Sequence, residues 1–322
     1  MIIPFRNEEK NLSKLLISLT KQNLNHNHFE VLFVNDHSTD KGCKIIEEFK
    51  QNEPSISVTL LHLSVIGGKK KAIKLGQQNA QGNYVVQSDA DCSFGNNWLK
   101  SIFQHFQSNN TEFLILPVHV TPKSSVISKF DSFDYASLQA VGLAMSKHNY
   151  PILCSGANLA YSIKLSEFDV IQPSLSSGDD IFLLQTALKN KKIISCIINS
   201  EVLSKSDSST SFNEFIEQRK RWLSKNTKVN DPIYQIVSVL AFAANISILI
   251  ALVLKIEYAS TLILLKFISD YLFLKKYYRL IGLTLNGIDF LISFICYPFY
   301  LLYLSLSTFS SKSIWKGRIV VD

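Results

Sequence analysis

The stretch Asn83-Tyr84-Val85-Val86-Gln87-Ser88-Asp89-Ala90-Asp91 decides how the rest of the chain is interpreted. Its apolar residues 84–86 predict a buried strand that ends in two aspartates one residue apart. Two carboxylates this close at a strand end can do two jobs, so one can bond a sugar hydroxyl while the other holds a hard divalent cation. Aspartates at the carboxyl end of a parallel strand lie where open α/β sheets bind nucleotides. Because most Asp-x-Asp pairs are solvated loop carboxylates, the remaining chain has to supply the rest of such a site.

Strands and helices alternate on both sides of this stretch. Apolar runs predict further strands at residues 1–4, 30–34, 58–63, 113–120 and 193–198, and a strand-turn segment at 152–161. Residues with helical periodicity separate most of these runs, and the first helix presents one apolar face, made of Leu12, Leu15, Leu16 and Leu19. The alternation predicts an α/β fold with a Rossmann-like, mostly parallel sheet flanked by helices.

Two other segments stand out in this part of the chain. Small residues at 154–158 predict a turn at which the backbone comes close to another group. The polar run 204–211 has no hydrophobic period and is expected to be mobile. The chain begins directly in a predicted strand at Met1, with no polar residues before it. We therefore expect the natural N-terminus to lie further upstream.

Charge and cysteine content limit the classes of partner that the chain is expected to bind. The 322 residues carry a net charge of +7, with clusters at 69–71, 219–228 and 275–279. The chain has no pattern of aromatic-basic interleaving that suggests nucleic acid, so we assign the charge to phosphate groups and a membrane surface and expect no nucleic acid. The five cysteines form no Cys-x-x-Cys pair, which is typical of reduced thiols in a protein that faces the cytoplasm.

The sequence becomes much more hydrophobic after Tyr234. Residues 234–254 carry no charge and 289–309 are nearly as apolar, so each is long enough to cross a bilayer. Residues 259–274 contain Lys266 and Asp270 and are a third possible span. We therefore expect a large domain at 1–228 and a membrane region at 229–322 with two or three transmembrane helices. The basic residues before the first span predict a multi-pass protein of the cell membrane whose large domain is cytoplasmic.

An ordered set of motifs runs through the large domain. Asp36, Asp89, Asp91 and Asp180 fall at predicted strand ends or helix starts, and Gln218-Arg219-Lys220-Arg221-Trp222 follows on a helix. In this order the motifs closely resemble those of family 2 glycosyltransferases of GT-A fold. The resemblance is greatest to the membrane-embedded branch that includes cellulose, hyaluronan and poly-N-acetylglucosamine synthases. It covers residues 1–228, and the hydrophobic tail extends it.

The resemblance implies a role for each matching residue. Asp91 would bind Mg²⁺ or Mn²⁺ on the donor diphosphate, and Asp180, the second acid of Gly178-Asp-Asp, would be the general base. Gln218 and Trp222 would contact the acceptor. The positions that would bind the donor nucleotide or its sugar are Pro4, Glu8, Asp36, Lys69, Asp89 and Arg221.

The chain departs from the family pattern at one position. The family's usual Asp-Asp pair after the second strand is Asn35-Asp36 here, so only Asp36 is carried over. The cluster 69–71 matches a segment with one donor-binding lysine, and which of its lysines takes that place stays open.

We expect a membrane-anchored enzyme that transfers a sugar, with inversion, from a nucleotide-sugar donor to a lipid or glycan at the cytoplasmic face. The resemblance implies that the donor is linked to UDP. One general base without a second nucleophilic acid favours direct displacement with inversion. A rival class is a non-catalytic or truncated membrane partner that only binds nucleotide sugars. Plainer interpretations also stand: Asp180 as a helix N-terminal acid, and Trp222 as an anchor at the membrane interface.

Overall fold

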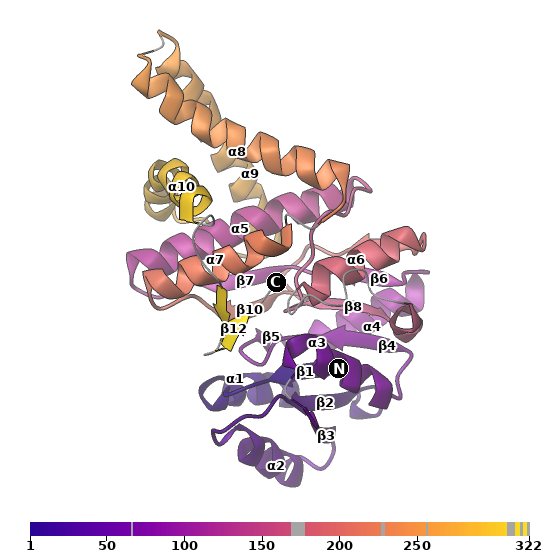
Figure 1. Cartoon of the computed structure of the whole chain (residues 1–322). Coiled ribbons are helices and arrows are strands. Elements are labelled where there is room, and N and C mark those ends of the chain that lie inside the picture. Colours follow the sequence, from indigo (N-terminus) through magenta and orange to yellow (C-terminus); the bar gives the residue numbers. More distant parts are fainter. Residues whose placement is uncertain are drawn as a thin grey trace. The chain divides into compact units, whose positions relative to one another are not determined.

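The computed structural model describes residues 1–65, 67–168, 178–226, 229–255, 257–307, 313–315 and 318–320 (Figure 1). The chain forms two compact units. The first unit is Met1–His119 with Gly142–Asp207, and the second unit is Val120–Val141 with Ser208–Asp322. The expected domain boundary at residue 228 and the expected span end at residue 309 fall outside the described residues, and the division at 228 stays a prediction.

The first unit is built on a seven-stranded sheet with the order β3-β2-β1-β4-β8-β6-β9. Its strands are β1 (Ile2–Phe5), β2 (Glu30–Asn35), β3 (Ser57–His62), β4 (Tyr84–Gln87), β6 (Phe113–Ile115), β8 (Leu159–Ser162) and β9 (Ile194–Cys196). The pairs β3–β2, β2–β1, β1–β4 and β6–β9 are parallel, and β8 runs antiparallel to both of its neighbours. The predicted α/β fold with a mostly parallel sheet is confirmed.

Helices connect the strands of this sheet. They are α1 (Glu9–Thr20), α2 (Gly42–Asn52), α3 (Gly68–Asn79), α4 (Trp98–Ser108) and α6 (Asp179–Lys189), with short 3₁₀ turns η1 (His26–His28) and η2 (Ile163–Glu167). The expected leucine face of α1 is buried. In the sheet, β1, β2 and β3 follow one another in one direction, and β4 lies on the other side of β1. Because the crossovers are right-handed, α1 and α2 cover one face of the sheet and α3 covers the opposite face. The carboxyl ends of β1, β2 and β4 therefore open at a common edge.

A small sheet with the order β5-β10-β7 corrects two expectations. Its strands are β5 (Ser93–Phe94), β7 (Val118–Thr121) and β10 (Ser204–Asp207). The run 113–120, expected as one strand, is divided between β6 and β7, since Pro117 lies between them and cannot donate to a ladder. The run 204–211 was expected to be mobile. That was wrong for 204–207, because pairing with β5 satisfies the backbone of a short polar strand.

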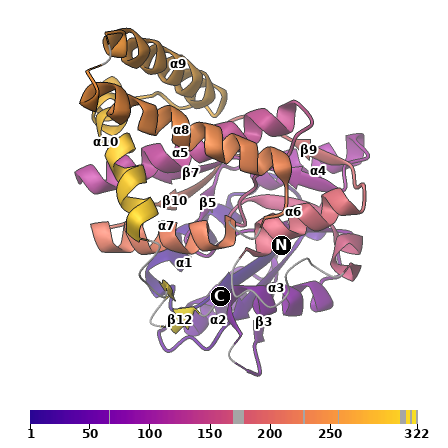
Figure 2. The same cartoon turned by 45° about the horizontal axis from the view of Figure 1, so that its top comes forward.

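The second unit is helical. Its elements are α5 (Val126–Lys147, of which 126–141 belong here), α7 (Phe212–Asn226), α8 (Pro232–Val253), α9 (Ala259–Leu280) and α10 (Gly287–Ser307), with a hairpin of β11 (Ser313–Trp315) and β12 (Arg318–Val320) (Figures 1 and 2). Ser211 accepts the backbone N–H of Glu214 (3.2 Å) and caps α7, as its Ser-x-x-Glu sequence predicts. Asp231 caps α8, which has proline in its first turn.

Two described helices, α8 and α10, are long and apolar enough to cross a membrane by length and composition. The α9 helix, which carries Lys266 and Asp270, does not meet that criterion.

Candidate functional site

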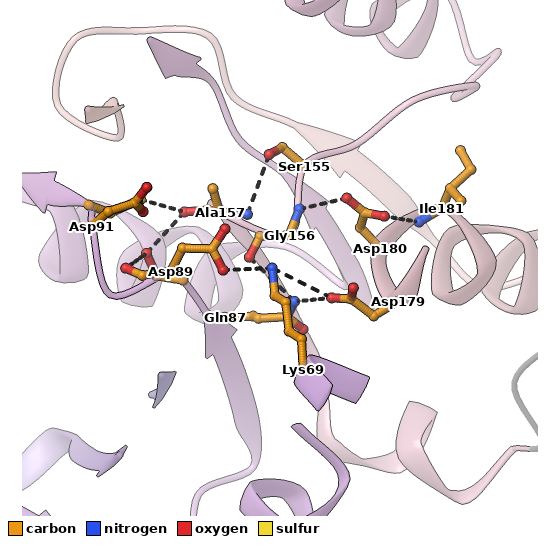
Figure 3. A network of polar contacts seen from close by, with 12 residues as sticks. Lys69, Gln87, Asp89, Asp91, Ser155, Gly156, Ala157, Asp179, Asp180 and Ile181 are labelled. Atoms are coloured by element: carbon orange, nitrogen blue, oxygen red, sulfur yellow. Dashed lines mark hydrogen bonds and ion pairs between the residues drawn. The ribbon is translucent and has the colours of Figure 1, made fainter. Parts of the chain in front are cut away.

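The edge of the main sheet where β4 ends brings several polar side chains of the first unit together (Figure 3). Asp89 and Asp91 follow β4 in a tight turn, which the backbone bond from Cys92 N–H to Asp89 C=O closes (3.2 Å). Asp179 and Asp180 open α6, and Lys69 lies in the first turn of α3. Residues far apart in the sequence thus meet because their elements start or end at this edge.

Lys69 lies among the carboxylates of this cluster. Its Nζ is 2.6 Å from Asp89 Oδ1 and 3.8 Å from Asp179 Oδ2. Burial alone would lower the pKa of Lys69, but the carboxylates of Asp179, Asp89 and Asp180 outweigh it and raise the pKa above that of an ordinary lysine. The ammonium therefore stays charged. Three carboxylates thus act on the Lys69 ammonium, and Asp179 also acts on that of Lys70.

Gln87 and Gly156 connect the two aspartates of α6 to the sheet. Gln87 Nε2 donates to Asp179 Oδ2 (2.8 Å) and to the carbonyl of Gly156 (3.3 Å). Asp180 accepts the N–H of Gly156 at Oδ2 (3.0 Å) and that of Ile181 at Oδ1 (2.8 Å). The neighbouring acids therefore have different surroundings: Asp179 faces Lys69 and Gln87, whereas Asp180 is held by two backbone amides.

The expected close approach at residues 154–158 is found at Gly156. A Cβ at this position would lie 3.0 Å from Gln87 Nε2, 3.0 Å from Lys69 Nζ and 3.1 Å from Asp179 Oδ2. An apolar carbon there would push apart three polar groups that contact one another. Glycine is the residue that leaves room for this cluster.

We expect Gly156→Ala to lower kcat/KM for sugar transfer by about a hundredfold, because displacing positioning groups by about 1 Å costs that much. The matched control is Gly95→Ala, since nothing lies within 4 Å of a Cβ at Gly95. Steady-state rates of both variants, with circular dichroism to verify folding, test the point. A Gly156→Ala enzyme as active as Gly95→Ala would show that the cluster tolerates expansion.

The loops after β1 and β2 form the neighbouring part of the edge. Asp36 is buried and accepts the backbone amides of Gly67 (3.4 Å) and Gly68 (3.1 Å). Asn7, at φ 52°, accepts the N–H of Thr39 (2.8 Å), which ties the two loops together. Asn7 is one of the few non-glycine residues in the left-handed region, a conformation that asparagine tolerates well.

Two donor-side candidates lie at the first of these loops. Pro4 is within β1, opposite Val34 of β2, and is buried. Glu8 is at the start of α1, where it accepts from Asn11 Nδ2 (2.7 Å). Because Asp36 N–H bonds the carbonyl of Phe5 (3.0 Å), Pro4, Glu8 and Asp36 all lie at the adjoining ends of β1 and β2.

Asp91 is the residue at this edge best suited to a cation. It is partly exposed and follows the strand end two residues after Asp89. The described residues contain no group of three or more His, Cys, Asp or Glu side chains that could hold a metal ion by themselves. A Mg²⁺ or Mn²⁺ ion carried on a diphosphate needs only one or two protein carboxylates, with phosphate and water oxygens completing its shell. Asp91 and the negative cluster beside it fit that requirement.

The remaining candidates lie on α7, in the second unit. Gln218, Arg221 and Trp222 are all partly exposed, and the Trp222 ring packs against Tyr135 of α5 with centroids 5.5 Å apart. Arg219, within the same motif, received no role from the sequence. It is 3% exposed and pairs with Asp131 Oδ1 and Asp134 Oδ2 of α5, each at 2.6 Å.

Sequence reasoning thus missed Gln87 and Arg219 as parts of these clusters. Gln87 belongs to the stretch 83–91 and lies two residues before Asp89. Side chains two residues apart in a strand point to the same side, and this is the sequence signal that places Gln87 beside Asp89. The sequence signal for the role of Arg219 lies in another helix. Asp131 and Asp134 are three residues apart in an aromatic segment, and two carboxylates buried there require a buried cation.

Comparisons with known proteins agree with this architecture. Residues 1–159 match the family described as "Glycosyl transferase family 2". A curated relative is the poly(ribitol-phosphate) β-N-acetylglucosaminyltransferase TarS of Staphylococcus aureus, 30% identical over 116 residues, which are 36% of this chain and 20% of TarS. The chain therefore matches only about a fifth of the length of that relative.

Two solved structures share the fold. The mannosyltransferase PcManGT of Pyrobaculum calidifontis, in complex with GDP-Man and Mn²⁺, has a TM-score of 0.57 and 16% identity, covering 96% of this chain and 86% of that one. Residues 1–349 of Staphylococcus aureus TarS, in complex with UDP-GlcNAc, give a TM-score of 0.52 and 18% identity, covering 99% and 94%. At these identities the likeness shows the fold.

Proposed function

Since residues 1–159 of the chain belong to glycosyl transferase family 2, we propose that the protein transfers a sugar, with inversion, from a nucleotide-sugar donor to a lipid or glycan acceptor at the cytoplasmic face of a membrane. The carrying observation is the cluster of Lys69, Asp89, Asp179 and Asp180 at the sheet edge where open α/β folds bind nucleotides. TarS, with its UDP-GlcNAc complex, supports a UDP-linked donor.

Asp180 is the proposed general base. Two backbone amides fix its carboxylate, so the side chain can meet an acceptor hydroxyl in one orientation and take its proton as the new bond forms. Asp179 is the weaker candidate, because Gln87 and Lys69 already engage its carboxylate. A single base that acts on the acceptor implies direct displacement and inversion at the anomeric carbon.

The donor is proposed to lie along the ends of β1, β2 and β4. Asp36 would bond the base, and the loop from Pro4 to Glu8 would hold the nucleoside. Lys69 and Asp89 form an ion pair that a donor can enter: the ammonium then meets phosphate or sugar oxygens, and the freed carboxylate accepts from a sugar hydroxyl.

Asp91 is proposed to hold Mg²⁺ or Mn²⁺ through its carboxylate. The ion would neutralise negative charge on the leaving diphosphate. Electrostatics support this, because a diphosphate that approaches these carboxylates is repelled unless a cation lies between them. PcManGT, with its Mn²⁺ complex, supports the same cofactor class.

Arg221, Gln218 and Trp222 are proposed to act from α7. A guanidinium suits phosphate through its forked donors, and an indole ring suits the apolar face of a sugar. The hydrophobic helices α8 and α10 support a membrane anchor, with the domain that carries the site on the cytoplasmic side.

The test is release of nucleotide by membranes that contain the full chain, over a panel of UDP-sugars and GDP-mannose, with Mn²⁺ or with EDTA. Metal-dependent release from one donor, stimulated by an added lipid or glycan acceptor, would establish the reaction and name its donor. If the folded, inserted protein releases no nucleotide from any donor but still binds UDP, it is a non-catalytic binding partner instead.

We expect Asp91→Ala to weaken UDP binding in Mn²⁺ by about ten- to a hundredfold, the loss typical of a damaged metal site, and to leave binding in EDTA unchanged. Calorimetric titration with UDP measures both conditions. Asp207→Ala is the control, because Asp207 lies elsewhere in the first unit and pairs with Lys14 at the surface (3.0 Å). If the unaltered protein binds UDP equally well in Mn²⁺ and in EDTA, the assignment of Asp91 is wrong.

A further inference from the structure

The guanidinium of Arg219 lies at the centre of a buried polar cluster in the second unit. Its Nε donates to Asp134 Oδ2 and its Nη2 to Asp131 Oδ1, each at 2.6 Å. Its Nη1 donates to Oε1 of Gln218 on the same helix, and Tyr300 of α10 is hydrogen-bonded to it as well. A guanidinium has five N–H donors in one plane and no acceptor, so these partners fix both its position and its plane.

The two carboxylates of this cluster are held by further contacts. Asp131 accepts the backbone N–H of Ser209 at Oδ2 (2.7 Å), and Asp134 is hydrogen-bonded to Tyr297 of α10. The guanidinium lies over the ring of Phe215, 4.6 Å from its centre. Because water is kept away, the polar contacts inside the cluster are strong and its geometry is well defined.

Stability alone does not account for three buried charges at this place. Well-packed apolar residues of the same volume stabilise a protein as much as a buried ion pair does, or more. The charges add direction, because each donor of the planar guanidinium is matched to one acceptor. The cluster therefore fixes the orientation of the side chains that Arg219 touches on α7, which are Gln218 and Trp222.

The amide of Gln218 is oriented by this contact. Adjacent residues of a helix point about 100° apart and do not ordinarily face each other. Gln218 and Arg219 do meet, because Asp131 and Asp134 hold the guanidinium beside the helix. Since a guanidinium only donates, the amide oxygen is the atom that faces it, and the amide nitrogen is the part that can meet a substrate. Gln218 is thus set as a donor, whose partner on a substrate is an oxygen atom.

The indole ring of Trp222 is held from two directions. Trp222 follows Arg219 by three residues, so the two side chains share one side of α7. The guanidinium lies over the ring, 4.3 Å from its centre, and the ring of Tyr135 of α5 lies 5.5 Å away, tilted by 60°. A ring with a fixed orientation loses less side-chain entropy when a sugar packs against it.

We infer that Arg219 is a positioning residue of the acceptor site: it turns the N–H groups of Gln218 toward an oxygen of the acceptor and sets the orientation of the Trp222 ring. Arg219 is buried and acts only through these two side chains. The inference deepens the acceptor part of the proposed function and rests on it. It also states the chemistry of the contact, because the acceptor offers Gln218 a hydroxyl, ring or phosphate oxygen.

Arg219→Lys tests the positioning role by kinetics. Lysine keeps the charge, but one ammonium lacks the planar fork that joins Gln218 to the two carboxylates. Nucleotide release by the full chain is measured with two acceptor probes, dioctanoylglycerol for a lipid and a tetrasaccharide of N-acetylglucosamine for a glycan. The KM of the probe that stimulates release should rise about tenfold, as for one lost hydrogen bond, while the KM of the donor stays within about twofold.

The matched control is Lys220→Arg, which makes the reverse exchange one residue later and should leave both KM values unchanged. Equal acceptor KM values for Arg219→Lys and Lys220→Arg would overturn the inference. A rise in the donor KM as large as that in the acceptor KM would also overturn it, because a loosened fold would then explain the effect.

Gln218→Glu separates positioning from stability. The carboxylate still accepts from Arg219, now as a charge-assisted pair, so the thermal midpoint should not fall. Both N–H donors are lost, however, so the KM of the acceptor probe should rise tenfold or more, on the order of a lost hydrogen bond or two. If Arg219 served stability alone, this variant would keep the acceptor KM of the unaltered protein, and that result would overturn the inference.

Fluorine NMR of the full chain in detergent follows Trp222 without any acceptor. The chain has three tryptophans, so 5-fluorotryptophan is incorporated and Trp222→Phe identifies the line of Trp222. Arg219→Lys should shift or broaden that line, because the guanidinium no longer lies over the ring, whereas Lys220→Arg should not. An unchanged line would overturn the inference. If the line changes but neither probe stimulates release, the proposed acceptor chemistry fails while the hold of Arg219 on Trp222 stands.

Discussion

Asp180→Asn should lower the turnover number for sugar transfer by about a thousandfold, within the range that a general base contributes. The asparagine amide keeps the shape of the side chain but cannot take a proton from an acceptor hydroxyl. UDP affinity in Mn²⁺ should stay within about twofold, since the asparagine side chain can still accept the backbone amides of Gly156 and Ile181 that hold Asp180. Steady-state release with saturating donor and acceptor, together with calorimetric titration, measures both quantities.

Asp179→Asn is the matched control, because it removes the same charge one residue earlier on α6. Its carboxylate meets Gln87 and Lys69, so its loss should raise the KM of the donor and change turnover much less. If Asp179→Asn lowers turnover and Asp180→Asn mainly raises the KM of the donor, Asp179 is the base and Asp180 serves only the helix N-terminus. Thermal midpoints of both variants verify folding, since an acid in a first helical turn contributes about 0.3–1 kcal/mol.

Most of the fold could be predicted from the sequence because its strands are short apolar runs between helices with clear periods. The leucine face of α1 and the strand before Asp89 follow directly from such patterns. Strand division was harder. Residues 113–120 read as one apolar run, and only the position of Pro117 indicates that two sheets share it. Polar residues 204–207 lack any hydrophobic signal, and pairing with β5 is what holds them in a strand.

The candidate site was only partly predictable. Aspartates at strand ends show where a cluster forms, but not how its members pair. That Lys69, and not Lys71, lies among the carboxylates depends on where α3 begins, and Gly68 already belongs to the helix. The first turn of α3 then holds Lys69 toward Asp89, while Lys71 is exposed. Pairings of this kind join residues far apart in the sequence, and no local pattern encodes them.

Arg219→Ala should lower the stability of the second unit by about 3–5 kcal/mol, the usual cost of breaking a buried ion pair. Burial by itself would lower the pKa of Arg219, but Asp134 and Asp131 raise it, so the guanidinium stays charged. Removing the cation leaves two buried carboxylates without their counterion. The guanidinium also packs over the Phe215 and Trp222 rings, at 4.6 and 4.3 Å, so packing is lost as well.

The measurement is the thermal midpoint of the full chain in detergent, where a drop on the order of 10 °C is expected for a loss of this size. Lys220→Ala is the control on the same helix, because the pair Lys220–Glu217 (3.2 Å) is partly exposed and such pairs contribute about 0–1 kcal/mol. Asp134→Asn should fall between the two, since Arg219 keeps Asp131. A midpoint for Arg219→Ala no lower than that for Lys220→Ala would mean that α5 and α7 are joined by their aromatic contacts and not by this ion cluster.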